Sequence, residues 1–202
     1  MTSCNQKSAE TSEAEEASIA SGQSIAYAVN VNQSMLNWLG KKVTGQHNGT
    51  VNFSEGNLQV EEGKIVSGKF VFDMKSIKVL DLTDAKMNKT LTDHLISPDF
   101  FAVDSFPTSS FEITKAEMLD TPVDGNNYNI SGNMTIRGIS KNISFPANIT
   151  VDESKVVAKG KVILDRTQWN VRYGSGKFVK GLGYKMIYDE FEVSLELTAE
   201  KQ

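Results

Sequence analysis

The fold is decided by residues 91–146, LTDHLISPDFFAVDSFPTSSFEITKAEMLDTPVDGNNYNISGNMTIRGISKNISFP. In this stretch a turn-rich aromatic segment leads directly into runs where apolar and polar residues alternate. The apolar members of three such runs are Phe111 and Ile113; Tyr128, Ile130, Met134 and Ile136; and Ile143, Phe145, Ala147 and Ile149. Alternation with a period of two indicates a strand with one dry and one wet side. Successive strands without crossover helices predict a closed antiparallel barrel or a sandwich.

The same alternation is found on both sides of this stretch. Further strands are predicted at residues 25–31, 51–60, 65–74, 156–164 and 191–197. Residues 34–39 could form a short helical turn. About eight strands make a barrel that fills its own interior or holds one small ligand. The sequence therefore predicts an all-β fold, a single eight-stranded antiparallel barrel.

One helix is predicted, over residues 81–95. Its apolar residues form an approximate helical stripe: Leu82, Ala85, Met87, Leu91 and Leu95. The Ser-Pro pair at 97–98 ends it, because the residue before a proline is driven out of the helical region. We expect this helix to lie near a mouth of the barrel.

Length and charge limit the number of domains and the kinds of partner. The chain has 202 residues and a formal net charge of −4, which corresponds to about one domain plus a tail. Its basic residues are scattered, which argues against a nucleic-acid partner. No apolar run approaches about eighteen residues, so no bilayer-spanning helix is expected. Residues 1–21, rich in Ser, Glu and Ala, are predicted to be a disordered tether, and residues 22–202 are predicted to be the barrel domain.

The single cysteine, Cys4, lies in this predicted tether. It follows the small residues Thr2 and Ser3 and precedes a polar, acidic segment. This order is typical of the cleavage end of a bacterial lipoprotein signal, in which Cys4 would carry the lipid, although the apolar part of such a signal is not present. The alternative is a plain N-terminus with an incidental cysteine. Lipidation at Cys4 would be the chain's only attachment to a membrane.

Catalytic and metal-binding constellations are weak in this sequence. The two histidines, His47 and His94, lie in different elements, and neither has a second His or a Cys at ligand spacing, so no metal site is expected. His94 and Asp93 lie near Ser97 and Ser105 in the sequence, but no Gly-x-Ser-x-Gly elbow is present. We therefore expect a protein that is not an enzyme.

Apolar side chains are more numerous than a minimal barrel needs. For each one alone, the simplest interpretation is core filling. Together they could line an apolar tunnel, in which small residues such as Gly132 and Gly160 would leave room for a ligand. Burial of a long apolar chain there would gain about 25 cal/mol per Å². The candidate lining residues are Phe70, Phe72, Phe100, Phe101, Phe106, Phe111, Ile113, Met134, Ile143, Phe145 and Trp169.

Three polar residues are candidates for contact with a ligand head group at the mouth. His94 lies at the end of the predicted helix, where it could equally be a capping or packing residue. Arg137 lies in an apolar strand and Arg166 follows Asp165. A buried arginine is costly without a partner, so each is first expected to pair with a carboxylate or with carbonyls. A cation at a barrel mouth would also suit a quinone carbonyl or a diphosphate.

Short motifs in the chain resemble those of the YceI-like polyisoprenoid-binding family. The resemblance extends from about residue 27 to residue 197. It rests mainly on DHL at 93–95, SPDFF at 97–101, FP at 106–107, MTIRG at 134–138, DRT at 165–167 and IYDEF at 187–191. The chain departs from the family pattern at 30–34, which reads NVNQS, and at 91–93, which reads LTD without the usual Arg.

This resemblance implies an elongated, lipocalin-like barrel with a long apolar tunnel. It also implies export to the bacterial periplasm or cell envelope, and some relatives form homodimers. The implied function is binding of a long-chain isoprenoid lipid, of the polyprenyl or isoprenoid quinone type, for carriage or sequestration. No covalent cofactor is implied beyond the bound lipid or quinone. Two alternatives remain open: a lipid-modifying enzyme on the same barrel, using His94 with Asp93 or Arg166, and a structural or partner-binding envelope domain.

Overall fold

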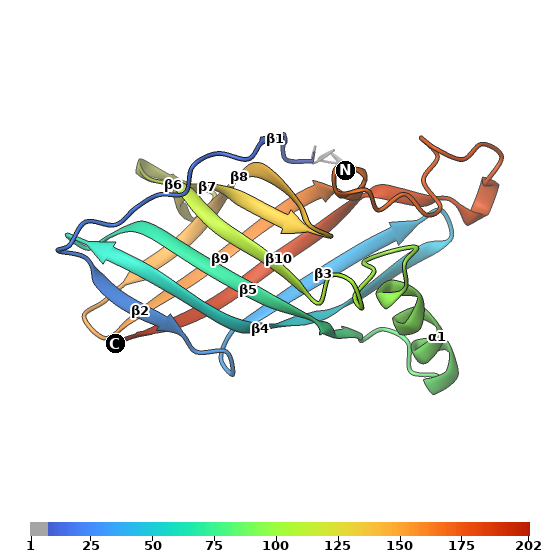
Figure 1. The fold of residues 1–202 in the computed structure, drawn as a ribbon, viewed down its shortest axis with the longest axis horizontal. Coiled ribbons are helices and arrows are strands. Elements are labelled where there is room, and N and C mark those ends of the chain that lie inside the picture. The colour runs from blue at the N-terminus through green and yellow to red at the C-terminus, as the bar shows by residue number, and fades with distance from the viewer. Residues whose placement is uncertain (1–7) are drawn as a thin grey trace.

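The computed structural model of the protein describes residues 8–202. One α-helix, α1 (Ala85–Ile96), lies at one end of an elongated assembly of strands (Figure 1). The strands are β1 (Ser12–Glu13), β2 (Ile25–Val29), β3 (Met35–Lys42), β4 (Gly45–Glu61), β5 (Lys64–Val79), β6 (Thr108–Val123), β7 (Asn126–Ile136), β8 (Ile139–Val151), β9 (Lys155–Asp165) and β10 (Ile187–Lys201). Two single-turn 3₁₀ helices, Arg166–Trp169 and Gly183–Lys185, lie in the connection between β9 and β10.

The strands close into a ring, and this confirms the predicted eight-stranded antiparallel barrel. From β4 to β10, each long strand pairs antiparallel with the next. The last strand, β10, then pairs with β2 and β3, which both pair with β4. Strands β2 and β3 together occupy one position in the ring. The result is an elongated, lipocalin-like barrel, and the sandwich is excluded because the ring closes.

The alternating sequence pattern corresponds to inward and outward faces. In β7, every second residue from Tyr128 to Ile136 is buried. One hydrophobic core runs along the barrel interior and includes Phe53, Phe70, Phe72 and Phe111. The interior is therefore formed by the same faces that the period of two predicts.

Helix α1 begins later than predicted. Asp84 is its N-cap, and the Asp84 side chain accepts a hydrogen bond from the backbone N–H of Met87. Asp81, the predicted start, instead accepts hydrogen bonds from the ring of His47 (2.8 Å) and the backbone N–H of Asn48 (3.0 Å). The helix ends at Ile96, next to the Ser-Pro pair. Its position at one end of the barrel, as expected, marks the mouth (Figure 1).

The short helical turn predicted at residues 34–39 is wrong. These residues enter strand β3, which pairs with β4 and β10. Their apolar spacing was too short to distinguish a helical turn from a strand. The hydrogen-bonding partners on both sides determine the strand conformation.

The described part of the predicted tether also differs from the expectation of an unpacked tail. Ser12 and Glu13 pair with Asn142 and Lys141 of β8, and the N–H of Ala9 donates to the carbonyl of Ile163 in β9 (2.7 Å). In this half of the barrel, residues 139–146 of β8 pair with β7 but not with β9. The N-terminal segment therefore fills a seam between β8 and β9. Sequence hydrophobicity misses this contact because backbone groups make it.

Candidate functional site

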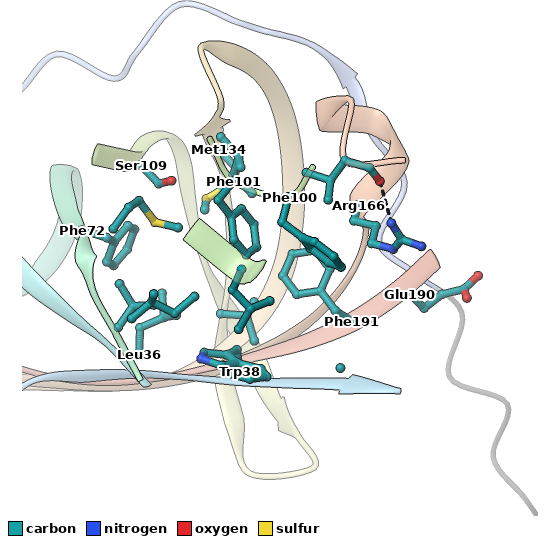
Figure 2. A pocket seen from close by; sticks show the side chains of 18 of the residues that line it. Leu36, Trp38, Phe72, Phe100, Phe101, Ser109, Met134, Arg166, Glu190 and Phe191 are labelled. Carbon is teal, nitrogen blue, oxygen red and sulfur yellow. Dashed lines mark hydrogen bonds between the residues drawn. The ribbon is translucent and has the colours of Figure 1, made fainter. Parts of the chain in front are cut away.

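The main apolar cavity lies inside the barrel at the α1 end. Its volume is about 110 Å³, and its walls are almost entirely apolar atoms. Phe72 enters it from β5 and Met134 from β7, and Phe100 and Phe101 enter from the segment after α1 (Figure 2). Leu36 and Trp38 of β3 form the wall below them in this view. Four of the predicted lining residues thus meet around one space.

A second, smaller apolar cavity lies further along the barrel. Its volume is about 40 Å³. Four more predicted lining residues face it: Phe70, Phe111, Ile113 and Phe145. The Phe53 ring lies between the two cavities, 5.0 Å from the Phe72 ring and 6.4 Å from the Phe70 ring (centroid distances). The apolar space is therefore divided by aromatic rings, whereas the sequence predicted one elongated tunnel.

Two glycines explain part of this division. A Cβ at Gly132 would lie 2.4 Å from the Phe111 ring and 2.6 Å from the Glu112 carbonyl oxygen. A Cβ at Gly160 would lie 2.9 Å from the Phe145 ring. Aromatic rings fill the space above these glycines, so no tunnel opens there. The absence of a side chain at each glycine allows a ring to pack directly on the backbone.

The remaining predicted lining residues lie outside both cavities. Phe106 packs over Gly138, and Ile143 is part of the buried core. Trp169 is completely buried, and its Nε1–H donates to the Met134 carbonyl (3.0 Å). Trp169 therefore supports the wall of the main cavity from behind.

A larger cavity opens at the mouth, next to the main apolar cavity. Its volume is about 510 Å³. The two cavities share wall residues, namely Trp38, Gly40, Leu95, Phe100 and Ile187. The other polar and aromatic residues around the mouth cavity are Lys41, Lys42, Thr44, His47, His94, Tyr173, Tyr184 and Lys185. The apolar interior and the polar mouth are thus contiguous, as an amphiphilic ligand requires.

His94 lies at the mouth. Its ring packs edge-on against Phe100 and Tyr173, with centroid distances of 4.9 and 4.5 Å. Its Nε2 lies 3.8 Å from the Asp99 carboxylate. Of the three head-group candidates, it is the one that faces the mouth cavity.

Arg166 is buried and its hydrogen-bonding groups are used by the protein itself. Its guanidinium donates to the carbonyls of Tyr188, Val171 and Ile187, and lies 3.4 Å from the Asp189 carboxylate. Burial lowers the pKa of Arg166, against the opposing effect of Asp189. Arg166 lines the main cavity, but its contacts join β9 to the start of β10.

Arg137 also bonds to backbone carbonyls. Its Nη1 donates to Phe100 (2.6 Å) and Asn170 (3.2 Å). These contacts hold the segment after α1 against the β7–β8 turn. The pairing with carbonyls that the sequence suggested for this arginine is therefore present.

Asp165 forms an ion pair at the edge of the mouth. The Lys177 Nζ lies 2.7 Å from Asp165 and 3.5 Å from Asp189. Burial alone would raise the pKa of Asp165, but hydrogen bonds from Lys177 and Thr167 outweigh it and hold the pKa below its ordinary value of 3.8. The ionised carboxylate therefore stabilises the fold above that pH, and this stabilisation is lost as the pH falls through the lowered pKa.

We expect Lys177→Met to flatten this acid dependence, because the pKa of Asp165 rises towards its unfolded value when the cation is removed. Urea unfolding at pH 7 and pH 3 measures the loss of stability on acidification. That loss should be smaller in Lys177→Met than in Lys180→Met, a control in the same loop. Equal losses in both variants would contradict the assignment.

Sequence reasoning missed the β3 contribution to the site. Leu36 and Trp38 line the main cavity, and Lys42 lines the mouth. Positions 36, 38, 40 and 42 lie on one face of an extended strand, and Leu36 and Trp38 begin an alternating pattern there. Gly40, Lys41 and Lys42 interrupt that pattern, so the prediction of a strand was weak. Among the described residues, no group of three His, Cys, Asp or Glu side chains is arranged to hold a metal ion. Cys4, the predicted lipidation site, lies outside the described residues.

The closed barrel and its apolar cavity define a lipocalin-like binding fold. The YceI-like domain family matches residues 27–199. The chain therefore belongs to the YceI-like family.

Solved structures share this fold at low sequence identity. BcnA from Burkholderia cenocepacia is 22% identical, with a TM-score of 0.65, over 84% of this chain and 98% of that one. A polyisoprenoid binding domain from Saccharophagus degradans is 13% identical, with a TM-score of 0.60, over 88% and 99%. A YceI protein from Campylobacter jejuni is 20% identical, with a TM-score of 0.53, over 75% and 84%. No curated protein sequence matches significantly. None of the helices in residues 8–202 has the length and apolar character needed to cross a membrane.

Proposed function

We propose that the protein binds a long-chain isoprenoid lipid, a polyprenyl compound or an isoprenoid quinone, in its apolar interior. The observation that carries this proposal is the almost wholly apolar cavity that continues into a polar mouth. One solved relative is described as a polyisoprenoid binding domain. Burial of an apolar chain contributes about 25 cal/mol per Å² without a specific polar contact.

The hydrocarbon chain of the ligand could enter through the mouth and reach the aromatic rings around Phe53. Further penetration requires the rings of Phe72 and Phe70 to move, because they contact Phe53 on both sides. Such rotation would join the two apolar cavities. A long isoprenoid would then occupy the whole length of the barrel, and a shorter one the mouth half alone.

Carriage or sequestration in the bacterial envelope is the role that we propose for this binding. Export and a lipid anchor at Cys4 remain part of the proposal. A lipid-modifying enzyme is less favoured, because His94 packs between aromatic rings and its nearest carboxylate, Asp99, lies 3.8 Å away. Arg166, the other residue considered for catalysis, bonds to backbone carbonyls.

Native mass spectrometry of protein purified from a bacterial host tests the proposal. We expect a fraction with the mass of one bound lipid, and organic extraction should release an isoprenoid chain. Extracts from a Phe72→Asp variant provide the control for surface-adsorbed lipid. Recovery of no lipid, together with no binding of added farnesol or quinone, would contradict the proposal.

A further inference from the structure

We infer that residues 175–186, a loop at the α1 end of the barrel, form a docking surface for an anionic lipid bilayer. The loop belongs to the connection between β9 and β10, which projects beyond the strands at that end (Figure 1). A part that projects from the end of an elongated molecule is the first to meet a flat surface. The inference concerns the outside of the molecule and goes beyond the proposed ligand binding.

Hydrogen bonds give this loop a defined shape. The Ile187 N–H donates to the Gly174 carbonyl (2.9 Å), which ties the two ends of the loop together. The carbonyl of the completely buried Ser175 accepts from the N–H groups of Phe178 (3.2 Å) and Val179 (3.0 Å). A compact surface loop with its ends close together is an Ω-loop, a type that is frequently functional. The buried base of the loop therefore fixes the turn that carries Phe178 and Val179.

The loop exposes two adjacent apolar side chains. Phe178 is 48% exposed and Val179 is 46% exposed, and neither belongs to the hydrophobic core. Neither of them lines the main apolar cavity or the mouth cavity. Val43, in the neighbouring turn between β3 and β4, is 48% exposed, and its N–H donates to the Met186 carbonyl (3.1 Å). Single exposed apolar residues are normal, but a group of them on a projecting part indicates an interaction surface.

Positive charge accompanies these apolar side chains. Residues 170–186 contain one arginine and three lysines but no aspartate or glutamate, whereas the whole chain has a formal net charge of −4. Lys177 is already paired with two carboxylates. Arg172 and Lys180 are exposed and form no ion pair with any described residue. Positive charge is therefore local on an acidic chain, which favours approach of this end to an anionic surface.

Carboxylates near the loop do not neutralise these two free cations. Asp165 and Asp189 lie 2.7 and 3.5 Å from the Nζ of Lys177. Glu190 follows the loop in β10, is exposed, and forms no ion pair with a described cation. The two free cations are thus available to an external anion.

An arginine and an aromatic ring lie together on this surface. The Cζ of Arg172 lies 4.5 Å from the centroid of the Phe178 ring, a cation–π contact. At a bilayer, such a ring enters the boundary between head groups and acyl chains, while the cation meets lipid phosphates. An acidic protein partner is less favoured, because a stable protein interface takes about 20–30 residues on each side. A few side chains on a projecting loop suit a bilayer surface better.

Vesicle sedimentation tests the inference with the full chain, without acylation and without added ligand. We expect binding to vesicles of phosphatidylglycerol and phosphatidylcholine (about 1:1) to be about tenfold tighter than binding to phosphatidylcholine alone, because the two free cations are attracted only by the anionic surface. High salt should remove most of this difference.

Variants of the loop separate the apolar contribution from the charge. Phe178→Ser with Val179→Ser should weaken binding to both kinds of vesicle about tenfold, because less apolar surface is buried at the bilayer. Arg172→Gln with Lys180→Gln should weaken binding to the anionic vesicles alone, also about tenfold. Circular dichroism checks that each variant is folded.

Matched controls lie at the opposite end of the barrel. Val123→Ser removes an apolar side chain that is 61% exposed there. Lys64→Gln with Lys155→Gln removes two exposed positive charges, the same change in net charge as in the loop variant. Neither control should change binding to either kind of vesicle.

Failure of the inference can be told from failure of the proposed function. No binding of the parent chain to anionic vesicles would overturn the docking surface and leave the ligand, which native mass spectrometry detects, unaffected. Equal losses in the loop variants and the controls would also overturn it. A dimer in analytical ultracentrifugation that Phe178→Ser with Val179→Ser dissociates, without vesicle binding, would assign the loop to contact between two copies of the chain and overturn the bilayer.

Discussion

The variant Phe72→Asp should reduce affinity for an isoprenoid ligand about 100-fold or more. Phe72 is buried and points into the main apolar cavity. An ionised carboxylate there must be desolvated when the apolar chain enters, and the effective penalty is several kcal/mol. Each 1.4 kcal/mol corresponds to about a tenfold change in the dissociation constant. Titration with farnesol measures the loss.

Phe72→Leu is the matched control, since it keeps an apolar side chain in the same place and should retain most of the affinity. Circular dichroism and thermal melts must show that the Asp variant remains folded. Phe145→Asp, in the second apolar cavity, then reports how far the chain penetrates: a long isoprenoid should lose affinity and a short one should not. A folded Phe72→Asp protein with unchanged affinity would place the ligand elsewhere.

Trp169→Ala should strongly destabilise the protein. The side chain is completely buried, and its Nε1–H bonds to the carbonyl of Met134. Loss of a large buried aromatic side chain costs about 3–5 kcal/mol. For a chain of this size that lowers the thermal midpoint by about 6–20 °C.

Trp169→Phe separates the two contributions, because it removes the hydrogen bond and keeps most of the packing. Its expected cost is about 1–3 kcal/mol, the range for a buried acceptor left without its partner. Chemical unfolding monitored by circular dichroism gives both values. If the free energy of unfolding of Trp169→Ala lay within about 1 kcal/mol of the parent's, the wall of the main apolar cavity would not depend on this residue.

Local patterns predicted the elements better than their contacts. The alternation in β7 located both its strand conformation and its buried face. Local sequence patterns could not distinguish a barrel from a sandwich, because the difference depends on the pairing of β10 with β2 and β3. The start of α1 was misplaced for a similar reason. Both Asp81 and Asp84 are plausible caps, and it is the distant His47 that engages Asp81.

The site was predictable in its apolar part and less so in its polar part. Apolar faces such as that of Phe72 follow from alternation alone. Arg166 was correctly expected to need a partner, but its main partners are carbonyls of β10 and of Val171, which no sequence motif encodes. The lysines of the mouth cavity were missed because the pairing of β3 with β10 brings Lys42 and Lys185, which are distant in sequence, to the same cavity.

If Cys4 carries a lipid, as proposed above, the docking of the N-terminal segment limits how far the barrel stands from the membrane. Ala9 is held by Ile163, close to where β9 reaches the mouth end. Only three residues, 5–7, separate Cys4 from Ser8, and a fully extended chain from residue 4 to residue 8 reaches about 14 Å. An unattached segment as far as residue 21 would reach about 60 Å. Acylation of Cys4 would thus make these residues a short tether that keeps the mouth of the barrel close to the bilayer surface. A lipid that moves between the bilayer and the mouth would then cross little water.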